Sequence, residues 1–253
     1  MDHEIQKASL WKRVAAGILD VILLLTLATG MAAALSALVG YDSYNQEYQQ
    51  INQKYAAQFG IDLNISSEAY QNLTEQERQP YDAFDKAING DSRAVYLYNM
   101  MINLMLLIIT GGILIAFLVL ELLMPLLMKN GQTVGKKVFS LCLVRNDGVR
   151  MNNIQLFTRT VLAKFAVETM IPVYMVLLLL FGQGNIVSIL VVAAILLTQL
   201  FSMIATRNNC LLHDLMSGTV VVDYGTQRIF GSTQELIDYQ AKMAAERAAR
   251  QTY

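Results

Sequence analysis

The sequence is poor in the residues that build metal sites and disulfides. It has two cysteines and two histidines among 253 residues. Cys142 and Cys210 form neither a CxxC motif nor a zinc-binding spacing, so we predict both to be buried small hydrophobic residues. His213 precedes Asp214, but a metal-dependent phosphohydrolase needs further histidines, and the only other one is His3. The sequence therefore predicts no resident metal or cofactor.

Charged residues are also scarce. They make up 15% of the chain, where soluble proteins average about 25%, and the net charge is only −1. No basic stripe is present, which argues against a nucleic-acid partner. Gly-x-Ser-x-Gly and His-Glu-x-x-His motifs are absent, and residues 131–137 lack the glycine spacing of a phosphate-binding loop. We therefore expect no enzymatic activity.

Hydrophobic residues, in contrast, make up 55% of the chain and are concentrated in long blocks. Four blocks reach the roughly 20 residues that a helix needs to cross a bilayer. The first block is about 26 residues long, whereas the hydrophobic part of a signal peptide has about 7 to 15, so we expect it to remain as a helix. The predicted fold class is an all-α membrane protein with four transmembrane helices, a small cytoplasmic β-element and a polar extracytoplasmic loop.

The positions of lysine and arginine predict the orientation. They cluster before the first span, between the second and third, and after the fourth, whereas residues 41–95 carry nine acidic and four basic side chains. We therefore expect a multi-pass protein of the cell membrane with both termini in the cytoplasm. The expected segments are a cytoplasmic N-terminus (1–13), transmembrane helix 1 (14–40), an extracytoplasmic helical loop (41–95), transmembrane helix 2 (96–128), a cytoplasmic β-hairpin connection (129–155), transmembrane helix 3 (156–181), a short outer turn (182–185), transmembrane helix 4 (186–206) and a cytoplasmic strand with a C-terminal helix (207–253).

The connections carry their own signals. Residues 41–95 are polar and helix-forming, with Pro80 as a predicted break. Residues 138–144 are followed by Asp147-Gly148, a strong hairpin signal, and residues 219–223 could complete a three-stranded sheet. The tail opens with a capping box at Ser232 and continues as a solvated helix.

Ionisable residues within or beside the predicted spans are the candidate functional residues. A carboxylate such as Asp20 costs roughly 2.5 to 3.5 kcal/mol to insert, so it should face protein or water. Arg13 lies two helical turns from Asp20 and therefore on the same helix face. Glu121 lies near the inner end of the second span. Arg159, Lys164 and Glu168 lie in the third, the last two at the i, i+4 spacing of an ion pair.

Two interpretations of these residues remain open. In the first, Asp20 pairs with a basic residue such as Arg13 or Arg159 and only locks the helices together, while Arg159 and Lys164 extend to the lipid headgroups. In the second, Asp20 and Asp214 line a water-accessible cavity and bind a cation or proton, with Arg13 lowering their pKa values. Glu121 and Glu168 are secondary candidates in that case.

Three separated motifs together resemble one family. They are Arg13-x-x-Ala16-x-x-x-Asp20, then Gly131-x-Thr133-x-Gly135-Lys136 leading to Asp147-Gly148, and Leu212-His213-Asp214 leading to Ser217-Gly218-Thr219-Val-Val-Val222. In this order between hydrophobic spans, they resemble the RDD family of bacterial and archaeal membrane proteins, named for an arginine and two aspartates.

By position, Arg13, Asp20 and Asp214 match the naming residues of the family, and Arg159 falls where a family arginine is common. The resemblance covers roughly residues 8–40 and 96–224, and it implies an integral membrane protein with a transport or ion-exchange role.

The leading hypothesis is a transporter or transport accessory that exchanges a small cation for protons. Its partners would be the lipid bilayer and, because four helices make a small transporter, further copies of the chain in a homo-oligomer. The alternative is a non-catalytic membrane scaffold or assembly factor that binds partners through its outer loop and cytoplasmic face. For a shared site, Asp20, Asp214, Arg13 and Arg159 should converge near the cytoplasmic boundary.

Overall fold

The chain folds into two compact units. The computed structural model describes residues 5–128, 131–180, 182 and 184–251. Unit 1 comprises Met1–Leu27 and Leu114–Tyr253, and unit 2 comprises Ala28–Ile113. Residues 129–130 and 181, at the edges of the predicted second connection and third span, lie outside the described residues.

Four helical stretches among the described residues are long and apolar enough to cross a membrane, which confirms the four predicted spans. They are α1 (Leu10–Val39); α5 (Ser92–Phe117) continued by η1 (Leu118–Leu123) and α6 (Met124–Leu127); α8 (Asn153–Phe157) continued by η2 (Thr158–Met170) and α9 (Ile171–Leu180); and α10 (Ile186–Ala205). Because α1 begins at Leu10 and not at residue 14, Asp20 lies ~15 Å from the helix start instead of ~9 Å.

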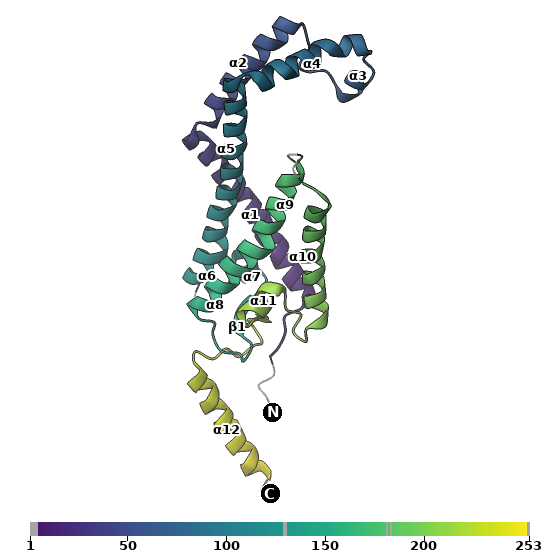
Figure 1. Ribbon diagram of the computed structural model, residues 1–253. Helices are drawn as coiled ribbons and strands as arrows, with labels where there is room; N and C mark the ends of the chain where they lie inside the picture. The colour runs from purple at the N-terminus through teal and green to yellow at the C-terminus, as the bar shows by residue number, and fades with distance from the viewer. Residues whose placement is uncertain (1–4, 129–130, 181, 183, 252–253) are drawn as a thin grey trace. The chain divides into compact units, whose positions relative to one another are not determined.

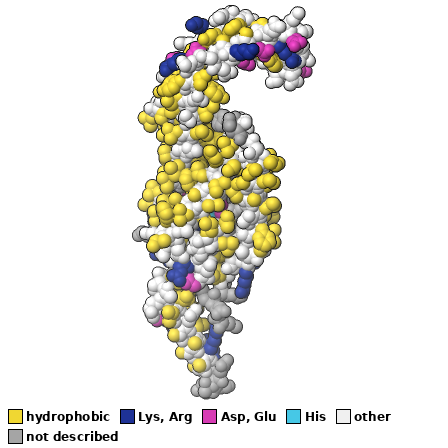
Figure 2. All heavy atoms as spheres, in the orientation of Figure 1, with side chains coloured by type: hydrophobic (Ala, Val, Ile, Leu, Met, Phe, Trp, Pro, Cys, Tyr) yellow, Lys and Arg dark blue, Asp and Glu magenta, His cyan; other side chains and the backbone are white. Residues whose placement is uncertain are grey.

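The outward surfaces of these helices are apolar. Phe201 and Ile204 of α10 are 72% and 77% exposed, and Leu180 of α9 is 74% exposed. Figure 2 shows hydrophobic side chains over the visible faces of α9 and α10. Large exposed apolar patches of this kind are rare on soluble proteins and match a lipid environment.

Two of the spans contain π-helix, in which the backbone bonds run from residue i to i+5. These segments are η1 and η2. The hydroxyl of Thr160 in η2 donates to the carbonyl oxygen of Glu121 in η1 at 3.1 Å. The two segments are thus linked where both depart from α-helical geometry.

Two strands form the sheet of unit 1. β1 (Leu141–Arg145) pairs antiparallel with β2 (Thr219–Asp223), with Leu141 opposite Asp223. Cys142 and Cys210 pack with Val144, Val220 and Val222 as buried free thiols, as the sequence predicts. Burial raises the pKa of the Cys142 thiol to about 12.

The predicted hairpin is present only as a tight turn. Gly148 adopts φ +82°, and the Arg145 amide donates to the Val149 carbonyl at 2.8 Å. The returning chain then makes single bridges, from Val144 to Arg150 and from Val149 to Phe230. It cannot continue as a strand because Asn152 already caps α8.

Unit 2 contains α2 (Tyr41–Phe59), α3 (Ser67–Gln71) and α4 (Glu75–Gly90), and α2 and α4 lie side by side (Figure 1). The predicted helical loop is therefore helical, but the predicted break at Pro80 is wrong. Thr74 and Glu77 form a capping box that starts α4. Pro80 has no backbone N–H, so the helix loses one hydrogen bond, the one to the carbonyl of Gln76. Because Gln76 is exposed, water can reach that region, and the helix continues past Pro80.

Close backbone packing also occurs within unit 2. A Cβ added to Gly112 of α5 would lie 2.9 Å from the Ala28 carbonyl oxygen and 3.0 Å from the Ala32 amide nitrogen of α1. Small residues allow membrane helices to approach this closely, which strengthens van der Waals contact.

The described part of unit 1 also contains α7 (Val134–Val138), α11 (Leu212–Ser217) and α12 (Thr233–Gln251). α12 is mostly exposed, as predicted for a solvated helix. It is attached through Leu236, which packs on Val149 and Phe230, and through Tyr239, whose ring centre lies 4.3 Å from the Arg228 guanidinium.

Candidate functional site

A charged cavity of about 230 Å³ lies inside unit 1. Its ionisable lining comes from α1, η1, α7, η2 and α11: Arg13, Asp20, Glu121, Lys136, Arg159, Lys164, His213 and Asp214. The four residues predicted to converge all line it. Apolar side chains such as Leu24, Phe117 and Val221 complete the wall. The cavity is large enough to hold several water molecules.

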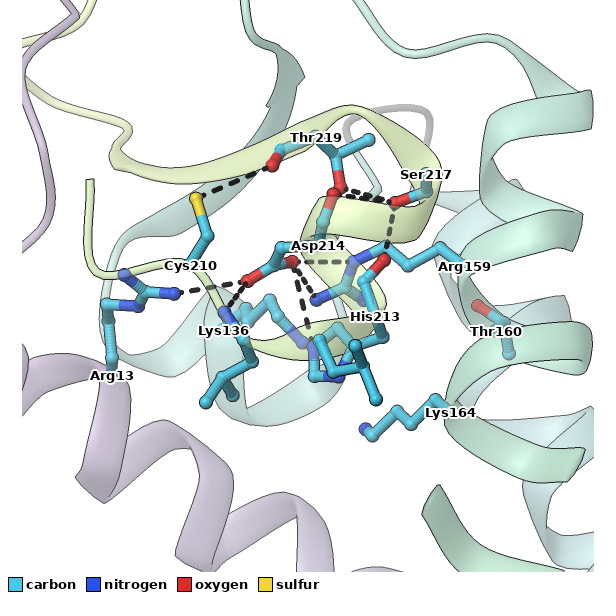
Figure 3. Close-up of polar contacts among 12 residues, drawn as sticks. Arg13, Lys136, Arg159, Thr160, Lys164, Cys210, His213, Asp214, Ser217 and Thr219 are labelled. Carbon is cyan, nitrogen blue, oxygen red and sulfur yellow. Dashed lines mark hydrogen bonds and ion pairs between the residues drawn. The ribbon is translucent and has the colours of Figure 1, made fainter. Parts of the chain in front are cut away.

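Asp214 is held by two guanidinium groups (Figure 3). Its Oδ1 accepts hydrogen bonds from Arg159 Nε at 3.0 Å and Nη2 at 2.8 Å, and its Oδ2 accepts from Arg13 Nη2 at 3.2 Å. The Leu211 amide donates to the same Oδ2 at 3.2 Å, and Arg13 Nη1 reaches the Asn208 carbonyl at 2.9 Å. We call this arrangement of Arg13, Arg159 and Asp214 the arginine clasp. It joins α1, η2 and α11.

The clasp keeps Asp214 ionised. Burial acts to raise the pKa of Asp214, but the neighbouring charges, with Arg159 the largest contributor, hold that pKa well below its usual range. Asp214 is fully buried and Arg159 is 2% exposed, so we do not find Arg159 extending to lipid headgroups. Both oxygens of Asp214 are occupied by donors.

His213 joins α11 to the third span. Its backbone amide donates to Glu168 Oε1 at 2.8 Å, and its Nδ1 lies 2.7 Å from Glu168 Oε2. Burial, reinforced by the charge of Arg159, lowers the pKa of His213, so the ring is neutral at pH 7 and donates its Nδ1 hydrogen to Glu168. Both carboxylate oxygens of Glu168 therefore contact His213 and hold α11 against the third span.

The expected pairing of Lys164 with Glu168 is wrong. Lys164 forms an ion pair with Glu121 of η1, while Glu168 contacts His213. The expectation assumed an α-helix, in which residues four apart share a face. η2 is instead a π-helix, and each of these two side chains is paired with a residue of another element, η1 or α11.

Asp20 connects α1 to the start of α7. Its Oδ2 accepts from the Thr133 hydroxyl at 2.5 Å, and its Oδ1 accepts from the Gly135 amide at 2.7 Å. Lys136 Nζ is more distant, 3.8 Å from Oδ2. Within the part of the chain that the structure describes, these are the polar partners of Asp20, so the basic residue near Asp20 is Lys136 and not Arg13 or Arg159. Sequence periodicity gives a helix face, but not the segment that packs on it.

The glycine motif explains this close contact. A Cβ at Gly135 would lie 2.3 Å from the Ala16 carbonyl oxygen and 2.8 Å from Asp20 Oδ1, so only glycine fits. Gly131 adopts φ +62°, where L-residues are strained. Thr133 caps α7 by accepting from the Lys136 amide at 3.3 Å.

The remaining motif residues shape the chain after α11. Gly218 ends the helix at φ +64°, which favours glycine. Thr219 then begins β2, fully buried, with its hydroxyl 2.8 Å from that of Ser217.

Glu121 differs from the other carboxylates of the cavity. It is 3% exposed, and its Oε1 is ion-paired with Lys164. Among the described residues no hydrogen-bond donor reaches its Oε2, although this oxygen is buried. Lys164 Nζ also lies 5.5 Å from the centre of the Phe117 ring. Glu121 therefore lines the cavity and has one buried carboxylate oxygen that is unpaired among the described residues.

Lys136 was expected only as a motif residue, but it lies in the cavity. It is 8% exposed, and its Nζ donates to Thr133 Oγ1 at 3.1 Å. Burial lowers the pKa of Lys136 to about 8, with Arg159 and Lys164 adding to the decrease while Glu121 and Asp20 oppose it. The Thr133-x-Gly135-Lys136 pattern contained a usable signal, because a threonine cap places the residue three positions later beside it.

No group of three or more His, Cys, Asp or Glu side chains in the described part of the chain could hold a metal ion. The lining instead combines four basic side chains, Arg13, Lys136, Arg159 and Lys164, with three carboxylates, Asp20, Glu121 and Asp214.

The family model that matches this chain is that of the RDD family, over residues 7–218. The match includes every ionisable residue of the cavity lining. Neither a curated protein nor a solved structure matches the chain.

Proposed function

Because the chain belongs to the RDD family of integral membrane proteins, we propose that it exchanges a small monovalent cation for protons across the membrane. Glu121 is the carboxylate that binds the cation in this proposal. The observation that supports it most is the buried Oε2 oxygen of Glu121, which has no hydrogen-bond donor among the described residues.

The other two carboxylates of the cavity are less suited to this role. A cation at Asp214 would have to displace Arg13 or Arg159, whose guanidinium groups would also repel it. A cation at Asp20 would compete with the Thr133 hydroxyl and the Gly135 amide, which fix α7. We therefore assign Asp20, Asp214, Arg13 and Arg159 to packing, and Glu121 to binding.

Glu121 has the chemistry that a small cation requires. Leaving a buried polar atom without a partner costs about 1 to 3 kcal/mol, and more when the group is charged. A cation or a proton at Oε2 would remove this cost. Alkali cations prefer oxygen ligands, and water in the cavity can supply the rest of the coordination shell.

The same proposal covers location and assembly. Lysine and arginine distribution supports a cell-membrane protein with both termini and the two-stranded sheet in the cytoplasm. A homo-oligomer is expected because four spans make a small transporter. The protein acts as a transporter and not as an enzyme.

Cation flux in vesicles tests the proposal. The full chain is reconstituted in liposomes with an imposed pH gradient, and uptake of Na⁺, K⁺ and Li⁺ is followed with an internal pH dye. We expect the native protein to exchange at least one of these cations for protons and Glu121→Gln to lose at least 90% of the rate. Glu47→Gln is the matched control, because Glu47 lies in unit 2 and is 42% exposed in its ion pair with Arg93.

Two results would overturn the proposal. One is the absence of exchange for all three cations with correctly folded protein, which would favour the scaffold alternative. The other is native exchange in Glu121→Gln.

A further inference from the structure

We infer that Lys136 carries the exchanged proton: its ammonium supplies one positive charge to the cavity, and the cation binds at Glu121 once that proton has left. This inference rests on the proposed function, and it names the residue that couples cation binding to proton release.

The Lys136 ammonium is held more loosely than the arginines of the clasp. An ammonium group has three hydrogens to donate, and the one close acceptor found among the described residues is Thr133 Oγ1 at 3.1 Å. Its nearest carboxylate oxygen, Asp20 Oδ2, is 3.8 Å away and already accepts from Thr133. Losing the proton from Lys136 would therefore break no short ion pair.

Charged groups face Lys136 from each neighbouring element of the cavity. Asp20 belongs to α1, Glu121 to η1, Arg159 and Lys164 to η2, and Asp214 with the neutral His213 to α11. Glu121 stabilises the ammonium more than any other carboxylate does, ahead of Asp20. The two residues of the proposed exchange are therefore electrostatically coupled.

The charge balance of the cavity favours one-for-one exchange. With Lys136 protonated, the lining has four positive and three negative side chains, an excess of one positive charge. A monovalent cation would raise this excess to two in a poorly solvated site, which is unfavourable. If Lys136 first loses its proton, binding of the cation restores the original excess of one.

Burial and the positive charges of Arg159 and Lys164 lower the proton affinity of Lys136 enough for the side chain to release its proton near neutral pH. Its pKa of about 8 means that the ammonium and the amine are both well populated near neutral to mildly alkaline pH. An exposed lysine, with a pKa near 10.4, would remain protonated there.

Na⁺ binding as a function of pH tests the inference. Binding of radioactive Na⁺ to the purified full chain in detergent is measured from pH 6.5 to 9.5. For the native protein we expect the apparent affinity to rise about tenfold per pH unit up to pH 8 and then to level off. Lys136→Gln should bind at every pH as tightly as the native protein does at pH 9. Lys136→Arg, permanently charged, should bind at least tenfold more weakly at pH 9.

Matched controls separate this inference from the proposed function. Lys137→Gln removes the exposed neighbour of Lys136 and should keep the native pH profile. Glu121→Gln should lose Na⁺ binding at all pH values; if it binds as the native protein does, the proposed function fails. If Glu121→Gln loses binding while Lys136→Gln keeps the native pH slope, the Lys136 inference is overturned and the proposed function stands. Should Lys136→Gln fail to fold, Lys136→Met, whose side chain has a similar length, is measured instead. Binding that does not depend on pH would support the inference, and the native pH slope would overturn it.

Discussion

The substitution Asp214→Asn should destabilise the protein through the arginine clasp. Asparagine has nearly the same shape as aspartate, so the main change is the loss of the negative charge between Arg13 and Arg159. Arg159 is 2% exposed and cannot recover its interaction with water. Removing one partner of a buried ion pair typically costs about 3 to 5 kcal/mol because the remaining charge stays buried and unpaired.

A second ion pair in unit 1 provides the control. Asp223 pairs with Lys12 at 2.6 Å, but the Lys12 side chain is 46% exposed. Exposed pairs contribute about 0.2 to 1 kcal/mol, so Asp223→Asn should cost no more than that. Both variants and the native protein are unfolded by SDS in mixed micelles, and the free energies of unfolding are compared.

The double variant Asp214→Asn with Arg159→Met distinguishes the clasp from a general packing defect. Removing the more buried guanidinium should recover at least 1 kcal/mol relative to Asp214→Asn alone, whereas Arg159→Met alone should be destabilising. If Asp214→Asn costs within 1 kcal/mol of Asp223→Asn, the clasp does not stabilise the fold as inferred.

Two further predictions concern α7. Gly135→Ala should lower the free energy of unfolding by at least 2 kcal/mol, because the new Cβ would lie 2.3 Å from the Ala16 carbonyl oxygen. Gly17→Ala is the control: its new Cβ would have no atom within 4 Å, so the substitution should cost less than 0.5 kcal/mol. Equal losses of stability in the two variants would contradict the tight contact at Gly135. The folded-state pKa of Lys136, about 8, lies below its unfolded value of 10.5, so the unfolded chain binds more protons between these pH values and stability should rise with pH across that range. Relative to Lys136→Met, the native protein should gain up to about 3 kcal/mol between pH 8 and 10.5 in SDS unfolding, and a flat difference would show that Lys136 keeps an ordinary pKa.

The spans, the buried cysteines and the cavity-lining residues Arg13, Asp20, Arg159 and Asp214 could be predicted from the sequence. Long apolar blocks fix the spans, because a helix needs a set length to cross a bilayer. Ionisable residues within such blocks, such as Asp20 and Arg159, must find protein or water. The resemblance to the RDD family, whose naming residues include Arg13 and Asp214, predicted that these two lie with Asp20.

The pairings inside the cavity could not be predicted in the same way. Asp20 meets Thr133, which lies 113 residues further along the chain, and no periodicity in α1 encodes that contact. The partners of Lys164 and Glu168 lie on η1 and α11, so they depend on how these elements pack on η2 and not on the spacing of residues along the third span. The unpaired oxygen of Glu121 depends on how η1 packs on η2. The sequence therefore could not show that Glu121 is a better candidate for cation binding than Asp20 or Asp214.

The most direct test of cation–proton exchange at Glu121 is to count both ions in the same vesicles. Release of protons and uptake of radioactive Na⁺ are recorded together at pH 8 for the native protein and for Glu121→Gln. We expect one proton to leave for each Na⁺ that enters through the native protein, and neither movement with Glu121→Gln, although the variant remains folded. Native rates of both movements in Glu121→Gln, or Na⁺ uptake through the native protein without proton release, would contradict the exchange at Glu121.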